Sequence, residues 1–152
     1  MPIHFEILEA FRTKTDTSPL SRAAETTLKH QSVPEAAELS LVIANDEQLK
    51  LLNRQFRGID KPTDVLSFPA DMTDPESGAE YLGDIIISFE RAKAQAIAGG
   101  HSITAELQLL IIHGILHLLG HDHADPQEKN RMWQSQNDIL NQLCIANISP
   151  SE

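Results

Sequence analysis

The sequence has a single cysteine, few aromatic residues and fewer basic than acidic side chains. Cys144 is alone among 152 residues, which excludes an internal disulfide and a cysteine-based zinc cluster and fits a reducing compartment. Lys and Arg total 12 against 22 Asp and Glu, giving a formal net charge of −10. This balance excludes a protein that coats nucleic acid by bulk charge, because each phosphate contact needs a Lys or Arg. It allows a small basic patch on an acidic body.

Long hydrophobic runs and a secretory leader are also missing. The longest apolar stretch, 107–119, is interrupted by Gln108 and two histidines and is too short to span a bilayer. The N-terminal residues show no basic segment followed by an apolar core. With 41% hydrophobic and 22% charged residues, the composition is that of an ordinary globular protein. We therefore expect a single cytoplasmic domain over residues 1–152, without a membrane segment.

Short apolar runs alternate along the chain with segments of helical periodicity. Strands are expected over 39–44, 65–68 and 84–89, with a weaker candidate starting at residue 3. Helices are expected after Pro19, from Asn45 to Gly58, over 91–98, from 103 to about 120 and after Asp125. Residues 70–79, rich in Asp, Pro, Ser and Gly, are expected to form an exposed loop. This mixture of strands and helices indicates an α/β or α+β domain.

Four of the seven histidines fall in one short segment, HGILHLLGHDH, from 113 to 123. His113 and His117 are four residues apart, so on a helix they share a face and can bind one ion. Gly120 can take a positive φ and return the chain over that face, which brings His121 or His123 to the same point. Three neutral imidazoles are typical zinc ligands, and a site with three protein ligands keeps one position open. The pattern predicts a catalytic metal site at the end of a buried helix.

The same spacing matches the metal-binding frame of the metzincin metallopeptidases, with one difference. Those enzymes place a glutamate, the general base, directly after the first histidine, whereas Gly114 stands at that position here. A metal-bound water without this carboxylate lacks its usual proton acceptor. A zincin-like peptidase is therefore an alternative, and core histidines that hold no metal are a second one.

The histidine segment resembles the signature of the YbeY family of bacterial endoribonucleases. Two further blocks are similar to that family, namely 52–57 followed by 62–69, and 82–85. Together the blocks cover most of residues 51–123 in the family's order, whereas the first 35 residues show no match. The resemblance implies a mixed sheet of about four strands, with helices packed on it and the metal in a cleft.

The resemblance also implies a function, a metal-dependent and single-strand-specific endoribonuclease acting in 16S rRNA 3′ end maturation and ribosome quality control. Residue by residue, it makes His113, His117 and His123 the ligands of one divalent metal, with zinc the expected ion, and Arg57 the catalytic arginine. His121 falls where the family accepts other residues. The partners implied are single-stranded ribosomal RNA and the ribosome or its small subunit. A non-catalytic, metal-stabilised ribosome factor stays open as an alternative.

Arg57 suits RNA cleavage because a guanidinium offers planar, bidentate contact to phosphate and keeps its charge near neutral pH. Residues 49–62 contain four basic side chains and one acidic, a local charge of +3. Lys50, Arg54 and Arg57 follow i, i+4, i+7 spacing and line one face of the expected helix, which predicts an RNA-binding strip. The alternative is the solvated face of an amphipathic helix. Asp64 and Asp84 are candidate proton acceptors.

Overall fold

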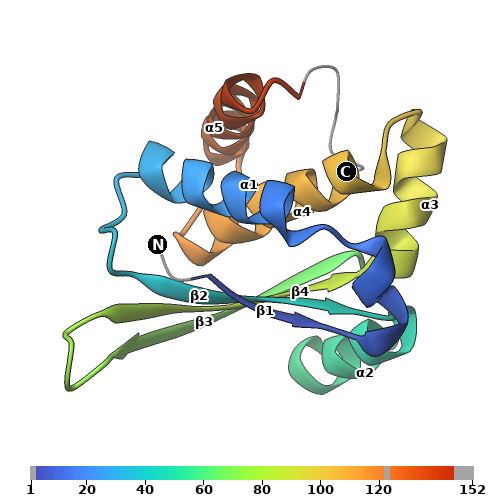
Figure 1. The fold of residues 1–152 in the computed structure, drawn as a ribbon, viewed down its shortest axis with the longest axis horizontal. Helices are drawn as coiled ribbons and strands as arrows, with labels where there is room; N and C mark the ends of the chain where they lie inside the picture. The colour runs from blue at the N-terminus through green and yellow to red at the C-terminus, as the bar shows by residue number, and fades with distance from the viewer. Residues whose placement is uncertain (1–2, 122–123, 146–152) are drawn as a thin grey trace.

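The computed structural model describes residues 3–121 and 124–145, and strands and helices alternate along them (Figure 1). The strands are β1 (Ile3–Ile7), β2 (Glu38–Ala44), β3 (Val65–Thr73) and β4 (Glu80–Ser88). The helices are η1 (Glu9–Lys14), a 3-10 helix, and α1 (Thr17–His30), α2 (Asp46–Arg57), α3 (Phe89–Gly99), α4 (Ile103–Leu118) and α5 (Pro126–Gln142). No helix in these two ranges is long and apolar enough to cross a membrane.

The four strands form one mixed sheet in the order β1-β2-β4-β3. Strand β2 pairs in parallel with both β1 and β4, whereas β3 pairs antiparallel with β4 and lies at an edge. This architecture confirms the predicted mixed sheet of about four strands with helices packed on it. Helix α4, which carries the histidine pair, and helix α2, which carries Arg57, both contact this edge strand.

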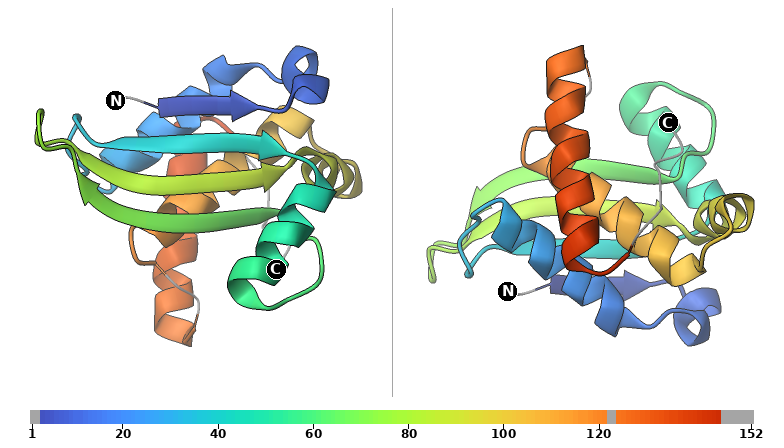
Figure 2. Two further views of the ribbon diagram at one scale, coloured as in Figure 1. Left: turned by 90° about the horizontal axis from the view of Figure 1, so that it is seen from below. Right: turned by 90° about the horizontal axis from the view of Figure 1, so that it is seen from above.

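The helices are divided unequally between the two faces of the sheet. Helices α1, α3, α4 and α5 lie on one face, and α2 covers part of the other (Figures 1 and 2). The main hydrophobic core fills the space between the sheet and the first group, and α4 runs through its centre with Ile111, Ile112 and Ile115 fully buried. A smaller cluster of Ala44, Leu49 and Leu66 lies beneath α2. The expected burial of the histidine-bearing helix is confirmed.

The local signals for helix ends are also confirmed. Asn45 and Gln48 form a capping box that opens α2, and Gly58 ends it in the left-handed conformation. The Asp125 side chain accepts a hydrogen bond from the Glu128 backbone at the start of α5, with proline in the first turn. These caps satisfy backbone groups that a helix leaves without internal partners.

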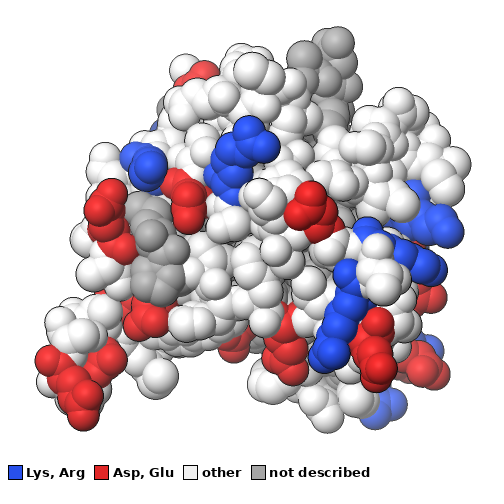
Figure 3. All heavy atoms as spheres, in the orientation of Figure 1, with Lys and Arg blue, Asp and Glu red and all other residues white. Residues whose placement is uncertain are grey.

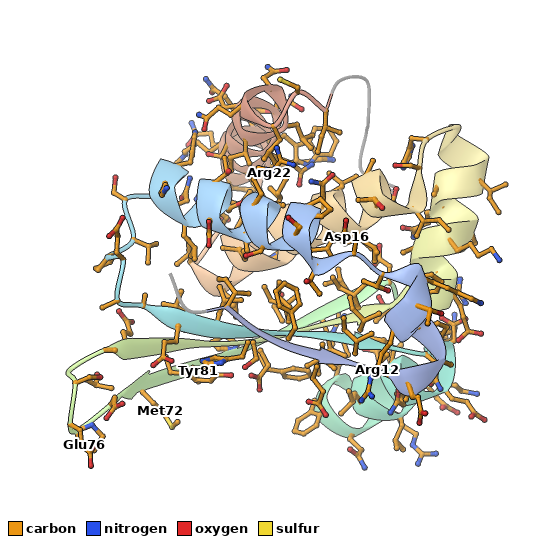
Figure 4. The ribbon with its side chains drawn as sticks, viewed as in Figure 1. Arg12, Asp16, Arg22, Met72, Glu76 and Tyr81 are labelled. Atoms are coloured by element: carbon orange, nitrogen blue, oxygen red, sulfur yellow. The ribbon has the colours of Figure 1, made fainter. Side chains whose placement is uncertain are left out.

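The prediction of an exposed loop over 70–79 is wrong for its first part. Strand β3 continues through Pro69 to Thr73 and forms a hairpin with β4, whose far end carries Met72 and Glu76 (Figure 4). Proline is tolerated because β3 is an edge strand and shifts register just after this residue. Opposite Pro69, Gly83 has φ +142°, and a Cβ there would lie 2.2 Å from the Phe68 carbonyl oxygen. Strand β3 can therefore stay paired with β4 at this point because Gly83 has no side chain that would collide with it.

Candidate metal centre

The first two predicted ligands lie against each other in the last turns of α4. Nε2 of His117 is 3.1 Å from Nε2 of His113, and the rings make an edge-to-face contact with centroids 4.6 Å apart. Both side chains are partly buried. Two nitrogen ligands at 2.0–2.1 Å from one tetrahedral zinc ion would lie about 3.3 Å apart. The observed spacing fits two ligands of a single ion, as the i, i+4 pattern predicts.

Helix α5 supplies a partner for the first of these rings. Nδ1 of His113 lies 3.3 Å from Oε1 of Gln136, a residue only 1% exposed. Because an amide oxygen only accepts, this contact requires the proton on Nδ1 of His113, which leaves the lone pair on Nε2, the atom that faces His117. Metal-binding histidines usually have such a partner, which fixes both the tautomer and the ring orientation. The pair is therefore oriented for binding a cation.

Gln136 was not predicted from the sequence. It is 23 residues from His113, and its contact depends on how α5 packs against α4. A signal was nevertheless present, because Gln136 falls on the stripe of α5 that also carries Met132, Ile139 and Leu140, all buried. A polar side chain on an apolar helix face must find a hydrogen-bond partner inside the protein.

The turn after α4 has the expected positive φ at Gly120. Gly120 has φ +96°, and the backbone N–H of His121 donates to the carbonyl oxygen of Leu116 at 2.9 Å. The predicted third ligand, His123, and its neighbour Asp122 lie outside the described residues. Within 3–121 and 124–145, no three His, Cys, Asp or Glu side chains form a group that could hold a metal. The ligand set thus stays a prediction that depends on His123.

His121 is held by a different part of the protein. Its Nε2 lies 2.7 Å from Oε1 of Gln31, which follows α1. Burial lowers the pKa of His121, and the charges of Arg131 and His30 lower it further. Its ring therefore ties the turn after α4 to the end of α1.

Gly114, between the two histidines, sits against the sheet. A Cβ at this position would lie 2.8 Å from Cγ2 of Ile85 on β4 and 3.3 Å from the hydroxyl of Ser67 on β3. The same hydroxyl donates a 3.1 Å hydrogen bond to the Gly114 carbonyl oxygen. There is no room for a glutamate side chain here, so the metzincin general base is absent for a steric reason.

The predicted basic strip is exposed on α2, and Arg57 is the last residue of that helix. Lys50 and Arg54 line a shallow hollow together with Glu47, Leu51 and Asp60. In Figure 3 the visible Lys and Arg side chains lie over α1 and at the end of the molecule that carries η1, α2 and α3, where acidic side chains lie between them. The strip is therefore accessible, and its positive charge is interrupted by carboxylates.

Arg57 and the histidines lie on different faces of the sheet, and β3 connects them. Ser67 contacts Gly114 on α4, whereas the next residue, Phe68, contacts Phe56 on α2. The end of α2 and the histidine turn of α4 thus flank the same edge strand (Figure 2).

The two candidate proton acceptors have different surroundings. Asp84 accepts a hydrogen bond from the Tyr81 hydroxyl, and burial and this carboxyl both raise the pKa of Tyr81. Because the adjacent Ile85 faces Gly114, Asp84 points to the opposite face of the sheet from the histidines. Asp64 accepts a 3.3 Å hydrogen bond from Gln95 of α3. The geometry excludes Asp84 as a base at the histidine pair.

Comparison with known proteins decides the family. The sequence model described as endoribonuclease YbeY matches residues 7–144. This chain belongs to the YbeY family. The endoribonuclease YbeY of Pelotomaculum thermopropionicum is 44% identical over 130 residues, covering 84% of this chain and 86% of that protein. The endoribonuclease YbeY of Geobacillus kaustophilus is 40% identical over 149 residues, covering 92% of this chain and 96% of that protein.

The YbeY resemblance found in the sequence is therefore confirmed, and the family match extends into the first 35 residues, where no likeness was expected. A Thermotoga maritima protein solved in solution shares the fold, with a TM-score of 0.62 over 99% of both chains and 24% identity.

Proposed function

We propose that this YbeY-family chain is a metal-dependent endoribonuclease that cleaves single-stranded RNA in 16S rRNA 3′ end maturation and ribosome quality control. Family membership confirms the endoribonuclease class and its role in rRNA processing, and the peptidase and non-catalytic alternatives are not favoured. The observation that supports metal dependence is the approach of two imidazole nitrogens to 3.1 Å, with Gln136 orienting one of them.

The proposed ligands of one divalent metal, zinc by its donor set, are His113, His117 and His123. A metal bound there would activate a water molecule or bind a phosphoryl oxygen. The protein's own contribution is rigidity, because α4 is buried on the sheet and Gln136 holds the His113 ring. Ligands fixed in this way need little rearrangement when they bind a cation.

Arg57 is proposed to bind the phosphate at which charge develops. Its guanidinium is exposed and can donate two parallel N–H···O bonds to phosphate oxygens. RNA that passes around the edge strand β3 meets Arg57 on one side and the histidine turn on the other. Lys50 and Arg54, on the same helix, would contact the backbone of the bound strand.

The proposed partners are single-stranded ribosomal RNA and the small ribosomal subunit, in the cytoplasm. A net charge of −10 with a local charge of +3 around α2 suits contact with a few phosphates rather than general binding of nucleic acid. Cys144, a free and exposed thiol, is compatible with a reducing compartment.

The test is to incubate the purified protein, metal-loaded or treated with a chelator, with single-stranded RNA, duplex RNA and casein. We expect cleavage of single-stranded RNA alone, lost on chelation and restored by zinc. His4→Ala, which changes an exposed histidine on β1, should cleave like wild type, whereas His117→Ala, purified in the same way, should not cleave and so controls for contaminating nucleases. Cleavage of casein alone would favour the peptidase, and ribosome binding without any cleavage would favour the non-catalytic factor.

A further inference from the structure

Phe56 is exposed at the end of α2, although it belongs to the apolar stripe of that helix. Its side chain is 66% exposed, whereas Leu49 at the other end of the stripe is fully buried. The end of this stripe is not covered by the sheet, because α2 extends beyond the edge strand β3 (Figure 2). The Phe56 ring makes an edge-to-face contact with Phe68 of β3, with centroids 5.2 Å apart. The ring is thus supported on one side and open on the other.

The backbone around this ring is held in place. Nδ2 of Asn53, a buried residue, donates a 2.9 Å hydrogen bond to the Lys61 carbonyl oxygen, and the Asn53 carbonyl accepts from the N–H of Ile59. These bonds fasten the loop after α2 to the helix that carries Phe56. Ile59 is also exposed, so two apolar side chains lie close together in sequence on this surface.

Exposed cations come from the same segment. Arg54, Arg57 and Lys61 are all exposed and lie within five residues of Phe56 in the sequence. An open aromatic ring with exposed positive side chains in the same segment suits single-stranded nucleic acid, since bases stack on the ring and phosphates contact the cations. Of the seven aromatic residues, 5 Phe, 1 Trp and 1 Tyr, all within the described part of the chain, only Phe56 is exposed and so available for stacking on a base.

We propose that Phe56, supported by Phe68, is a stacking platform for one base of the single-stranded RNA substrate. The inference rests on the proposed function, because it assigns a binding contact to the same substrate. The stacked base would lie close to the cleaved bond, because Phe56 adjoins Arg57, which is proposed to bind the phosphate where charge develops.

The first experiment measures binding of a labelled oligothymidine of about 12 nucleotides to the metal-loaded protein by fluorescence anisotropy. DNA is used because a ribonuclease that needs the 2′-hydroxyl leaves it intact, while stacking tolerates either sugar. Phe56→Ala should raise Kd about five- to 150-fold, the range for loss of one stacked base. Phe56→Trp should bind at least as tightly as wild type, because the indole keeps a flat ring. Ile97→Ala, which removes a 71% exposed side chain from α3, is the matched control and should bind like wild type.

Salt dependence separates stacking from charge. Phe56→Ala should weaken binding with an unchanged slope of log Kd against log salt, because no phosphate contact is lost. Arg54→Ala should instead reduce that slope. In RNA cleavage, Phe56→Ala should raise KM with little change in kcat. A reduced salt slope for Phe56→Ala, or a fall in kcat at constant KM, would contradict a stacking role.

A direct readout uses a tryptophan placed on the platform. In a Trp133→Phe background, which removes the native tryptophan, Phe56→Trp should lose fluorescence when the oligonucleotide binds, whereas Ile97→Trp should not respond. Equal Kd for wild type and Phe56→Ala, together with an unresponsive Trp at position 56, would overturn the platform while leaving RNA cleavage in place. Loss of ribosome binding at unchanged oligonucleotide affinity would overturn it in favour of a protein contact. If the wild-type protein does not cleave RNA, the proposed function itself fails, and this outcome is distinct from failure of the stacking platform.

Discussion

The hydroxyl of Ser67 donates a 3.1 Å hydrogen bond to the carbonyl oxygen of Gly114 and so joins the edge strand to the helix turn between the two histidines. This close approach is possible because Gly114 has no side chain, and a Cβ would overlap Ile85, which is fully buried. The histidine pair is therefore positioned by packing against the sheet, as well as by its own helix.

Gly114→Ala tests this packing. Alanine is the better helix former by about 1 kcal/mol, so an unconstrained site would be stabilised. Overpacking typically costs about 1–3 kcal/mol, and the buried Ile85 side chain cannot easily move away. We expect a lower free energy of unfolding in urea than wild type. A variant as stable as wild type, or more stable, would show that α4 does not depend on this contact.

Gln136→Leu tests the orientation of His113. Removing the partner of Nδ1 should weaken metal binding about 10- to 100-fold, measured by competition with a chelator of known affinity. Gln134→Leu changes the same residue type at an exposed position of α5 and should bind metal like wild type. Equal affinities for both variants would remove Gln136 from the site.

Arg57 tests whether the basic end of α2 takes part in cleavage. Arg57→Ala should keep its fold and metal content while losing RNA cleavage by a hundredfold or more, as expected for a group that stabilises charge in the transition state. Arg57→Lys should keep only part of the RNA cleavage, since an ammonium lacks the planar fork of a guanidinium. Lys50→Ala should instead weaken RNA binding, with an effect that shrinks as salt rises. Full cleavage by Arg57→Ala would exclude the arginine from the reaction.

Glu106 gives a prediction for pH and stability. It is 3% exposed, and burial raises its pKa despite a 2.6 Å contact with His101. The folded state therefore holds this proton more tightly than the unfolded chain, in which the carboxyl titrates near 4.5. The contribution of Glu106 to stability should fall as pH rises above that value through the raised pKa. In urea titrations across this range, Glu106→Gln should lose less stability with rising pH than wild type, and parallel curves would contradict the raised pKa.

The parts of the fold that were predicted from the sequence have local causes. The capping box at Asn45, the left-handed Gly58 and the i, i+4 spacing of His113 and His117 each depend on residues a few positions apart. The continuation of β3 through Pro69 was not predicted, because it depends on the edge position of the strand and on Gly83 across the ladder.

Tertiary packing also explains the features of the site that sequence alone missed. Gln136 reaches His113 only because α5 packs against α4. Periodicity assigns Phe56 to the buried face of α2, and its exposure arises because the helix extends beyond the sheet. The roles of Gln136 and Phe56 could therefore not be predicted without the arrangement of the helices and strands in space.

The most direct test of the central claim is the metal content per chain of three purified proteins: wild type, His117→Ala and His121→Ala. The proposed site predicts one equivalent in wild type, near background in His117→Ala because that ring is a ligand, and one equivalent in His121→Ala because that ring bonds Gln31 instead. A full equivalent of metal retained by His117→Ala would contradict a metal centre on this helix.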